Sequence, residues 1–405
     1  MRTRGAALWG NLVITGAGGF GNSPRMVATD KETGKVVWES SFQDTPDVTF
    51  TAAPLAIKDK IIVGAANGDT GVRDWIAGLD AATGKRLWLK YTIPAPGEPG
   101  SETWKGNSNA WRTGGGAVWV TGTYDPDTGN MNWYFQFTPG DMWDYDEVGT
   151  HILIDGQVGG QSRKLITHSA RNGFLYTMER ANGAMVLAKP YMEVNWTKGI
   201  DQKTGKPLEY DPAKDIQTYA GIGNLNSNEP PKTVCPSLLG GNNYWPSSYS
   251  PKTKLMYIPA LSNCSTITID REKHSKERGW NGGLAATAER WESDLKAADP
   301  LTGEIRKTVH LSYPNFSGTL ATGGGLVFLA LLDGTVAAFD DTTLDQLWKI
   351  NVGSGFSAPP MTFEVNGKQY IAIVSGPSPA ARARLVNTPE LREQRNAVVL
   401  HVFAL

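Results

Sequence analysis

The sequence predicts an all-β protein, a β-propeller built from four-stranded blades. A turn followed by Trp recurs along the chain, and short β-branched segments bounded by Gly, Asn or Asp fill the intervals. No long segment has the hydrophobic period of a helix. We therefore expect blades of roughly 45 residues each, of which about six are recognisable.

The recurring turn has the pattern Asp-x-x-Thr-Gly. It occurs in "ATDKETGKVVW" ending at Trp38, "GLDAATGKRLW" ending at Trp88 and "TYDPDTGNMNW" ending at Trp133, at spacings of 50 and 45 residues. Asp and Thr hydrogen-bond their own backbone and Gly accepts a positive φ, so the pattern predicts a hairpin between two strands. We expect each Trp to pack between neighbouring blades. Degenerate copies of the turn lie around Gly183 and Gly303 and before Trp348.

Two long segments break the repeat. Residues 189–250 are rich in Pro, Gly and Asn, and residues 264–296 contain "DREKHSKERGWNGG". Loops longer than about 15 residues are usually functional lids or disordered segments. We predict a single, incomplete propeller domain over residues 1–405, with these two loops on one of its faces.

The composition argues for a small-molecule partner. The net charge of −1, from 39 basic and 40 acidic residues, gives no reason to expect nucleic acid or an anionic membrane. No apolar run approaches the roughly 18 residues of a transmembrane segment. The start, "MRTRGAALWGNLVITGAGG", is expected to be a strand and not a signal peptide, because Asn11 interrupts its apolar part.

The stretch "GDMWDYDEVGTH", residues 140–151, combines carboxylates with large aromatic rings. If it is extended, Asp144 and Asp146 project to one side and Trp143 and Tyr145 to the other. Two acids on one side could share a cation. The alternative is that both are turn or capping residues.

Six motifs follow one another along nearly the whole chain: "GDTGVRDW" (68–75), "TGGGAVW" (113–119), "TPGDMWDYD" (138–146), "THSARNGFLYTMER" (167–180), "CPSLLGGNNYWP" (235–246) and "FSGTLATGGGLVFLALLDGT" (316–335). With the Trp-bearing repeats they resemble the pyrroloquinoline quinone (PQQ) dependent methanol and ethanol dehydrogenases. Members of that family are periplasmic quinoprotein β-propellers with eight blades.

The resemblance implies a quinoprotein alcohol dehydrogenase that oxidises a primary alcohol to an aldehyde and passes electrons from PQQ to a soluble cytochrome c. PQQ is a planar tricarboxylate ortho-quinone, and the reaction needs a Lewis acid and a base. The resemblance also implies a periplasmic location, although we expect no signal peptide in this chain, and it is compatible with a homodimer. The sequence does not name the alcohol, and the candidate liners of its pocket are Trp143, Trp245 and Trp280.

The resemblance also assigns a metal site for Ca²⁺ or a lanthanide(III) ion. Asp144 matches the catalytic base and metal ligand, and Asp146 matches an extra carboxylate of the members that use lanthanides. Asp69 aligns with a metal-ligating glutamate. Hard cations take oxygen ligands, and more anionic oxygens favour a more highly charged ion. Asp141 and Glu147 are expected to be solvated.

Five residues match contacts to PQQ. Trp119 matches the indole that lies beneath the ring, and Arg171 matches the arginine that hydrogen-bonds the quinone oxygens. Asn243 and Thr51 match neutral polar contacts, and Arg4 matches a carboxylate contact. A core position for Trp119 and an exposed salt bridge for Arg171 are the plainer alternatives.

Cys235 and Cys264 match a cysteine pair that forms a disulfide in the family, with two free thiols as the alternative. The chain also departs from the family. Between "GTYDP" and "DTGNMNW" it lacks about one repeat, including an asparagine that ligates the metal. The family's N-terminal segment and its disulfide between adjacent cysteines are also absent from this sequence. A non-catalytic propeller scaffold, or a decayed relative of the family, is therefore the alternative function.

Overall fold

The computed structural model describes residues 5–19, 22–45, 47–68, 71–103, 109–120, 133–214, 217–220, 232–269, 283–286, 290–376, 385 and 387–404. The chain divides into two compact units. The first is Met1–Asn130 with Asp270–Gly283, and the second is Met131–Ile269 with Leu284–Leu405. A single domain over residues 1–405 stays a prediction. Within the described ranges, no helix combines the length and apolar character needed to span a bilayer.

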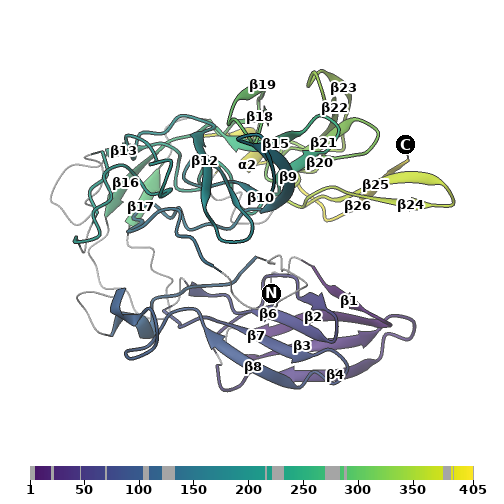
Figure 1. Cartoon of the computed structure of the whole chain (residues 1–405). Helices are drawn as coiled ribbons and strands as arrows, with labels where there is room; N and C mark the ends of the chain where they lie inside the picture. The colour runs from purple at the N-terminus through teal and green to yellow at the C-terminus, as the bar shows by residue number, and fades with distance from the viewer. Residues whose placement is uncertain are drawn as a thin grey trace. The chain divides into compact units, whose positions relative to one another are not determined.

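The first unit contains two antiparallel four-stranded sheets (Figure 1). They are formed in sequence order by β1 (Ala7–Trp9), β2 (Leu12–Gly19), β3 (Asn22–Asp30) and β4 (Val36–Ser41), and by β5 (Leu55–Ile57), β6 (Lys60–Gly64), β7 (Trp75–Asp80) and β8 (Arg86–Tyr91). Their facing sides share one core, in which the rings of Phe42 and Trp75 stack at 4.7 Å. Short 3₁₀ helices follow at Ser101–Thr103 and Ala110–Arg112.

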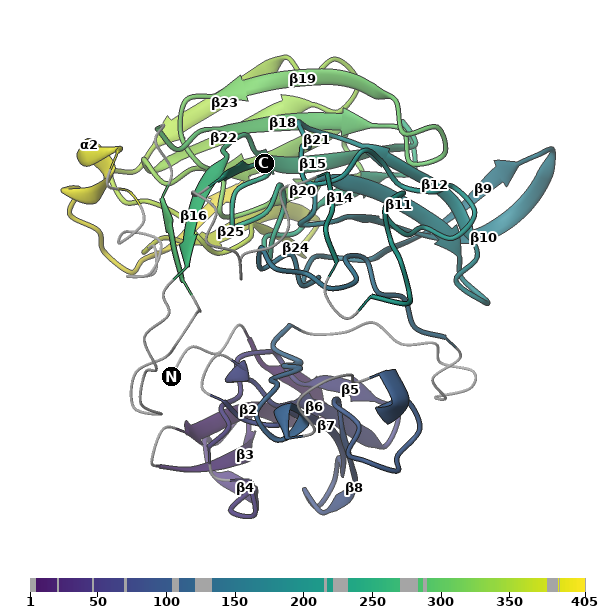
Figure 2. The same cartoon turned by 90° about the vertical axis from the view of Figure 1, so that its left-hand side faces the viewer.

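The second unit contains three four-stranded sheets and one large three-stranded sheet. The four-stranded sheets are β9 (Ile152–Val158), β10 (Gln161–Ser169), β11 (Phe174–Glu179) and β12 (Met185–Pro190); β14 (Ser248–Ser250), β15 (Leu255–Leu261), β18 (Ser293–Ala298) and β19 (Ile305–Leu311); and β20 (Thr319–Ala321), β21 (Leu326–Ala330), β22 (Thr335–Asp340) and β23 (Gln346–Asn351). The last two lie side by side (Figure 2) and share a core that contains Tyr257 and Phe339. The three-stranded sheet is β24 (Met361–Val365), β25 (Lys368–Val374) and β26 (Leu400–Ala404).

The all-β propeller prediction is confirmed. The described residues form six blades, five with four strands and one with three. The segments predicted as long loops also contain strands: β13 (Lys232–Val234), β16 (Ser265–Ile269) and β17 (Gly283–Ala286) pair in a small additional sheet. One short helix, α2 (Pro389–Arg392), precedes β26.

The Asp-x-x-Thr-Gly pattern forms the predicted hairpins. In the turn between β3 and β4, Asp30 Oδ1 accepts hydrogen bonds from the backbone N–H and the hydroxyl of Thr33, both at 2.8 Å, and Gly34 has a φ of +70°. Both hydrogen bonds favour the charged carboxylate and lower the pKa of Asp30. An unforeseen copy of this turn occupies residues 201–205, where no Trp follows.

Trp38 and Trp133 pack between blades, as predicted, whereas Trp88 is 36% exposed and covers Gly78 of its own blade. The indole of Trp38 in β4 donates to Ala81 O at 3.2 Å, in the turn of the next blade. Its ring covers Gly84, where an added Cβ would lie 2.4 Å from Trp38 Cε3. Trp133 makes the same contacts with Arg180 O, at 2.9 Å, and with Gly183. The turn before Trp133, including the predicted join in "YDPDTG", lies outside the described residues.

Candidate active site

The acidic loop, residues 140–151, leads into β9 in the second unit. Its side chains alternate as predicted: Trp143 and Tyr145 are buried, whereas the side chains of Asp144 and Asp146 are 52% and 58% exposed. The hydroxyl of Tyr145 donates to Pro236 O at 2.5 Å. The aromatic residues therefore anchor the loop in the core and leave the two carboxylates at the surface. Trp143 is a core residue and not a pocket liner.

A buried arginine joins the two carboxylates. Arg171 lies in the turn between β10 and β11, and only 4% of its side chain is exposed. One Nη donates to Asp144 Oδ2 and the other to Asp146 Oδ1, each at 2.8 Å. The guanidinium also donates to Leu238 O at 2.8 Å. The alternative of an exposed salt-bridged arginine is excluded, because only 4% of the Arg171 side chain is exposed.

The backbone near Arg171 and Asp144 has an unusual conformation and a close approach of two segments. Asp144 has a φ of +64°, a region that residues other than Gly rarely adopt and that is often found at functional sites. Gly240 approaches Arg171 so closely that an added Cβ would lie 2.7 Å from Arg171 Cβ. The Nε of Arg171 is buried and has no hydrogen-bond partner among the described residues. One donor of the guanidinium, the Nε–H, is therefore left without an acceptor among these residues.

The expectation that Glu147 is solvated is wrong. Its side chain is 9% exposed, and Oε2 lies 2.6 Å from Nε2 of His168 in β10. Its carboxylate also accepts the backbone N–H of Arg171, at 2.9 and 3.1 Å. Sequence reasoning missed these contacts because the partners lie 21 and 24 residues further along the chain.

Asp141 is also less solvated than expected. Its Oδ1 accepts the backbone N–H of Trp143 at 2.8 Å. Burial raises the pKa of the Asp141 carboxyl to about 7, although this hydrogen bond and the charge of Arg171 oppose the change.

Asn243 and Trp245 lie in the loop before β14. Asn243 is buried, its amide donates to Leu239 O at 2.8 Å, and its Oδ1 accepts the N–H of Tyr244 at 2.8 Å. Trp245 is buried and stacks on Phe316 at 4.8 Å. Trp245 is thus a core residue and not a pocket liner, while Asn243 stays a predicted cofactor contact.

The remaining predicted site residues belong to the first unit. Thr51 Oγ1 donates to the backbone oxygen of Trp119 at 3.0 Å, so these two residues meet within that unit. Arg4 and Asp69 lie outside the described residues, as does Trp280. The structure thus brings Asp144 and Asp146 together through Arg171, and Thr51 together with Trp119.

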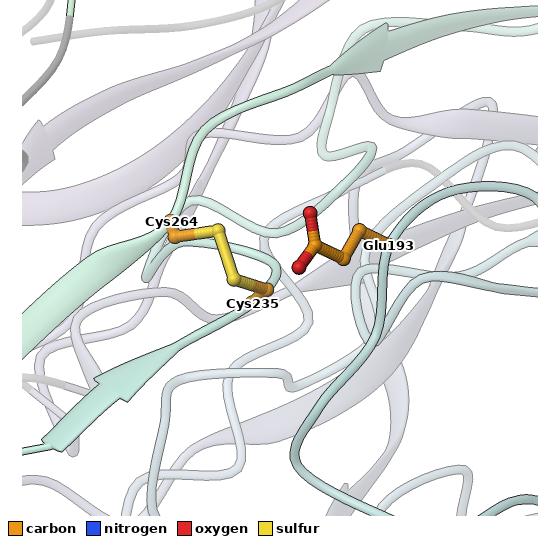
Figure 3. Close-up of side chains that lie close together, drawn as sticks. All are labelled: Glu193, Cys235 and Cys264. Atoms are coloured by element: carbon orange, nitrogen blue, oxygen red, sulfur yellow. A yellow bond between two sulfur atoms is a disulfide. The ribbon is translucent and has the colours of Figure 1, made fainter.

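Cys235 and Cys264 are joined by a disulfide in the second unit (Figure 3). The carboxylate of Glu193 lies beside it, and the three side chains have the proximity of a metal site. Metal-binding cysteines act as thiolates, and neither sulfur is a thiolate while the two are bonded to each other. This cluster is therefore not a metal site in the disulfide form.

The acidic loop offers ligands of the right chemistry for a hard cation. Asp144 and Asp146 each engage Arg171 through one carboxylate oxygen and expose more than half of the side chain. Carboxylate oxygens are the donors that calcium and lanthanide ions prefer. The Nε of Arg171, which has no partner within the described ranges, offers a charged donor to an anionic ligand. These residues fit both a metal ion and PQQ.

Comparison with known proteins identifies the family. The family model "PQQ: Glucose/ethanol/alcohol dehydrogenase, beta-propeller domain" matches residues 39–129, 125–204 and 282–371. The chain belongs to this family. A quinohemoprotein alcohol dehydrogenase of Comamonas testosteroni is 31% identical over 436 residues, which cover 92% of this chain and 59% of that protein. A lanthanide-dependent methanol dehydrogenase of Methylacidiphilum fumariolicum is 32% identical over 414 residues, covering 87% and 66% of the two chains.

Solved structures of PQQ-family dehydrogenases have the same fold. A europium-containing methanol dehydrogenase matches with a TM-score of 0.85 and 29% identity, covering 100% of this chain and 81% of the other. The quinohemoprotein alcohol dehydrogenase of Comamonas testosteroni matches with a TM-score of 0.86 over 66% of its chain. The chain spans about three fifths to two thirds of the length of the two relatives above.

Proposed function

We propose that this PQQ-family protein oxidises a primary alcohol to an aldehyde, with PQQ and a hard cation as cofactors. The observation that carries the proposal is the buried guanidinium of Arg171, which holds the half-exposed carboxylates of Asp144 and Asp146 together. PQQ would supply the electron acceptor and the metal ion a Lewis acid. The match to the PQQ-family model supports the proposal.

Asp144 would act as the base that takes the proton of the alcohol hydroxyl. Its side chain is 52% exposed, and Arg171 holds its Oδ2 at 2.8 Å. A general base must reach the proton through a hydrogen bond, so an exposed carboxylate on an anchored loop suits the task. Arg171 would hold the anionic cofactor through its permanent charge and its Nε, the guanidinium donor that has no partner among the described residues.

Asp144 and Asp146 would hold the metal, and Asp69, which the sequence also predicts as a ligand, lies outside the described residues. Such a ligand set is nearly all anionic, and charge favours a trivalent ion over Ca²⁺. The names of two similar proteins, one lanthanide-dependent and one europium-containing, support this choice.

We further propose a periplasmic location and a soluble cytochrome c as the electron acceptor. The disulfide between Cys235 and Cys264 supports an oxidising compartment, since disulfides rarely persist in the cytosol. Cytochrome c and a homodimer rest on the family resemblance.

Dye reduction tests the proposal. The purified chain is incubated with PQQ and either Ca²⁺ or La³⁺, and reduction of a redox dye is followed after addition of ethanol or another primary alcohol. Asp144→Asn should abolish turnover while PQQ still binds, because it removes the proton acceptor and keeps the shape. Asp155→Asn is the control, since this exposed carboxylate pairs only with Arg180, at 3.4 Å, among the described residues. No turnover with any alcohol and metal would favour the non-catalytic scaffold.

A further inference from the structure

His168 is a buried side chain for which the proposed chemistry has no use. It lies in β10 and is fully buried, with its ring stacked on that of His151 at a centroid distance of 4.0 Å and an interplanar angle of 4°. Phe137 packs against it at 5.2 Å. Burial and the neighbouring His168 lower the pKa of His151 to about 3, so the His151 ring is neutral near pH 7.

Both ring nitrogens of His168 contact the acidic loop. Nδ1 lies 3.1 Å from Thr150 O and must be the donor, because a carbonyl oxygen only accepts. Nε2 lies 2.6 Å from Glu147 Oε2. Gly149 permits this approach, since an added Cβ there would lie 2.8 Å from His168 Cε1. The loop therefore wraps around the edge of one imidazole ring.

Glu147 extends this contact to the candidate site. Its carboxylate accepts the backbone N–H of Arg171 at 2.9 and 3.1 Å. The guanidinium of Arg171 in turn binds Asp144 and Asp146, which belong to the same loop as Glu147. Glu147 thus fixes the main chain of Arg171, while the side chain of Arg171 fixes the two carboxylates.

We propose that Glu147 and His168 are positioning residues for the cofactor site. Because they tie the acidic loop to β10 and to the turn that carries Arg171, the guanidinium and the carboxylates of Asp144 and Asp146 meet the cofactor and the metal in one fixed geometry. Neighbours of this kind commonly set the affinity of a site without touching its ligand. The inference rests on the proposed function for the identity of the ligands, and its effect on the loop is independent of them.

Three variants separate position from charge. Glu147→Ala removes both contacts of the carboxylate. Glu147→Gln keeps them, because the amide oxygen can accept the Arg171 N–H and the amide NH₂ can donate to Nε2 of a neutral imidazole whose Nδ1 is protonated. His168→Phe keeps the ring between His151 and Phe137 and removes both hydrogen bonds.

A matched control loses similar hydrogen bonds elsewhere in the second unit. Glu209 accepts from the Thr197 hydroxyl at 2.7 Å and from the Lys198 N–H at 2.9 Å. It also accepts the Ala220 N–H at 3.2 Å, and it makes no hydrogen bond to the acidic loop or to Arg171 among the described residues. Glu209→Ala should therefore loosen its own loop and leave the candidate site unchanged.

Hydrogen–deuterium exchange of the chain without added ligand is the first measurement. Glu147→Ala and His168→Phe should speed exchange in peptides that cover residues 140–151 and Arg171, while Glu147→Gln and Glu209→Ala should keep wild-type rates there. Wild-type rates in both Glu147→Ala and His168→Phe would overturn the positioning role. Because His168→Phe preserves the packing, it decides the question if Glu147→Ala does not fold.

Titration with La³⁺ and then PQQ, followed by Trp fluorescence, is the second measurement. Glu147→Ala and His168→Phe should weaken binding by about tenfold or more, the usual effect of removing such a neighbour, and Glu147→Gln should restore it. Faster exchange with unchanged affinity would overturn the link to the cofactor site. If the wild-type chain binds neither ligand, the proposed function fails, while the exchange experiment still decides whether the two residues hold the loop.

Discussion

Replacing Arg171 by Met should separate activity from stability. The variant keeps an unbranched side chain of similar length and removes the charge and all donors of the guanidinium. The four groups that lose a donor are the carboxylates of Asp144 and Asp146 and the backbone oxygens of Asp146 and Leu238.

The expected loss of stability is small. The two carboxylates are 52% and 58% exposed, so each ion pair contributes about 0 to 1 kcal/mol. Leaving Leu238 O without this donor costs about 1 to 3 kcal/mol. Burying a thioether in place of a cation offsets part of the loss, so the free energy of unfolding should fall by about 1 to 3 kcal/mol. Turnover should fall about a hundredfold or more, as for the loss of one preorganised donor.

Urea denaturation and PQQ-dependent dye reduction measure the two effects on the same preparations. The turnover of Arg171→Lys should lie between those of the wild type and Arg171→Met, because lysine keeps the charge and lacks the forked donors of the guanidinium. Arg163→Met is the matched control, since Arg163 in β10 pairs with Glu179 on the same sheet and makes no contact with the acidic loop among the described residues. A large loss of stability with unchanged turnover in Arg171→Met would refute the reasoning and assign Arg171 a structural role.

The other predictions concern the disulfide, a shifted pKa and the metal. Replacing Cys235 and Cys264, which are 29 residues apart, by Ala should lower the free energy of unfolding by roughly 3 to 4 kcal/mol; an unchanged urea midpoint would contradict this. The pKa of Asp141 is raised to about 7 in the folded state. From about pH 4 to pH 7 the folded state therefore keeps a proton on this carboxyl that the unfolded state releases. Because of this difference, the contribution of Asp141 to stability falls as the pH rises through that window. Asp141→Asn should remove that fall, and urea midpoints that differ from wild type by a constant amount from pH 4 to pH 8 would count against it. Asp146→Ala should narrow the preference for La³⁺ over Ca²⁺ in calorimetric titrations, and an unchanged ratio would show that this carboxylate does not bind the metal.

Local patterns in the sequence predicted the blades well. The turn at Asp30 follows from hydrogen bonds within a few residues. The position of Trp38 between blades follows from the repeated Gly, which leaves room for the indole in the turn of the next blade. The turn at residues 201–205 has the same chemistry but lacks the Trp that drew attention to the others. Strands β13 and β16 lie in the two segments that break the repeat, so their pairing depends on contacts that no local period reveals.

The candidate site was predictable in its residue types and only partly in its contacts. Alternation along the acidic loop placed Asp144 and Asp146 outward and the aromatic rings inward. The sequence did not reveal that Arg171 joins the two acids, or that Glu147 contacts the buried His168, because these contacts link residues more than 20 positions apart. Such pairings depend on how β10 and the loop meet in three dimensions.

Calorimetric titration of PQQ into the chain, in the presence of La³⁺ or Ca²⁺, tests the central claim most directly. The claim is that Arg171, Asp144 and Asp146 form the binding site of an anionic quinone cofactor and its metal. We predict stoichiometric binding of one PQQ per chain that requires the metal and is lost in Arg171→Met. Absence of binding with both metals, or binding of equal strength in Arg171→Met, would contradict it.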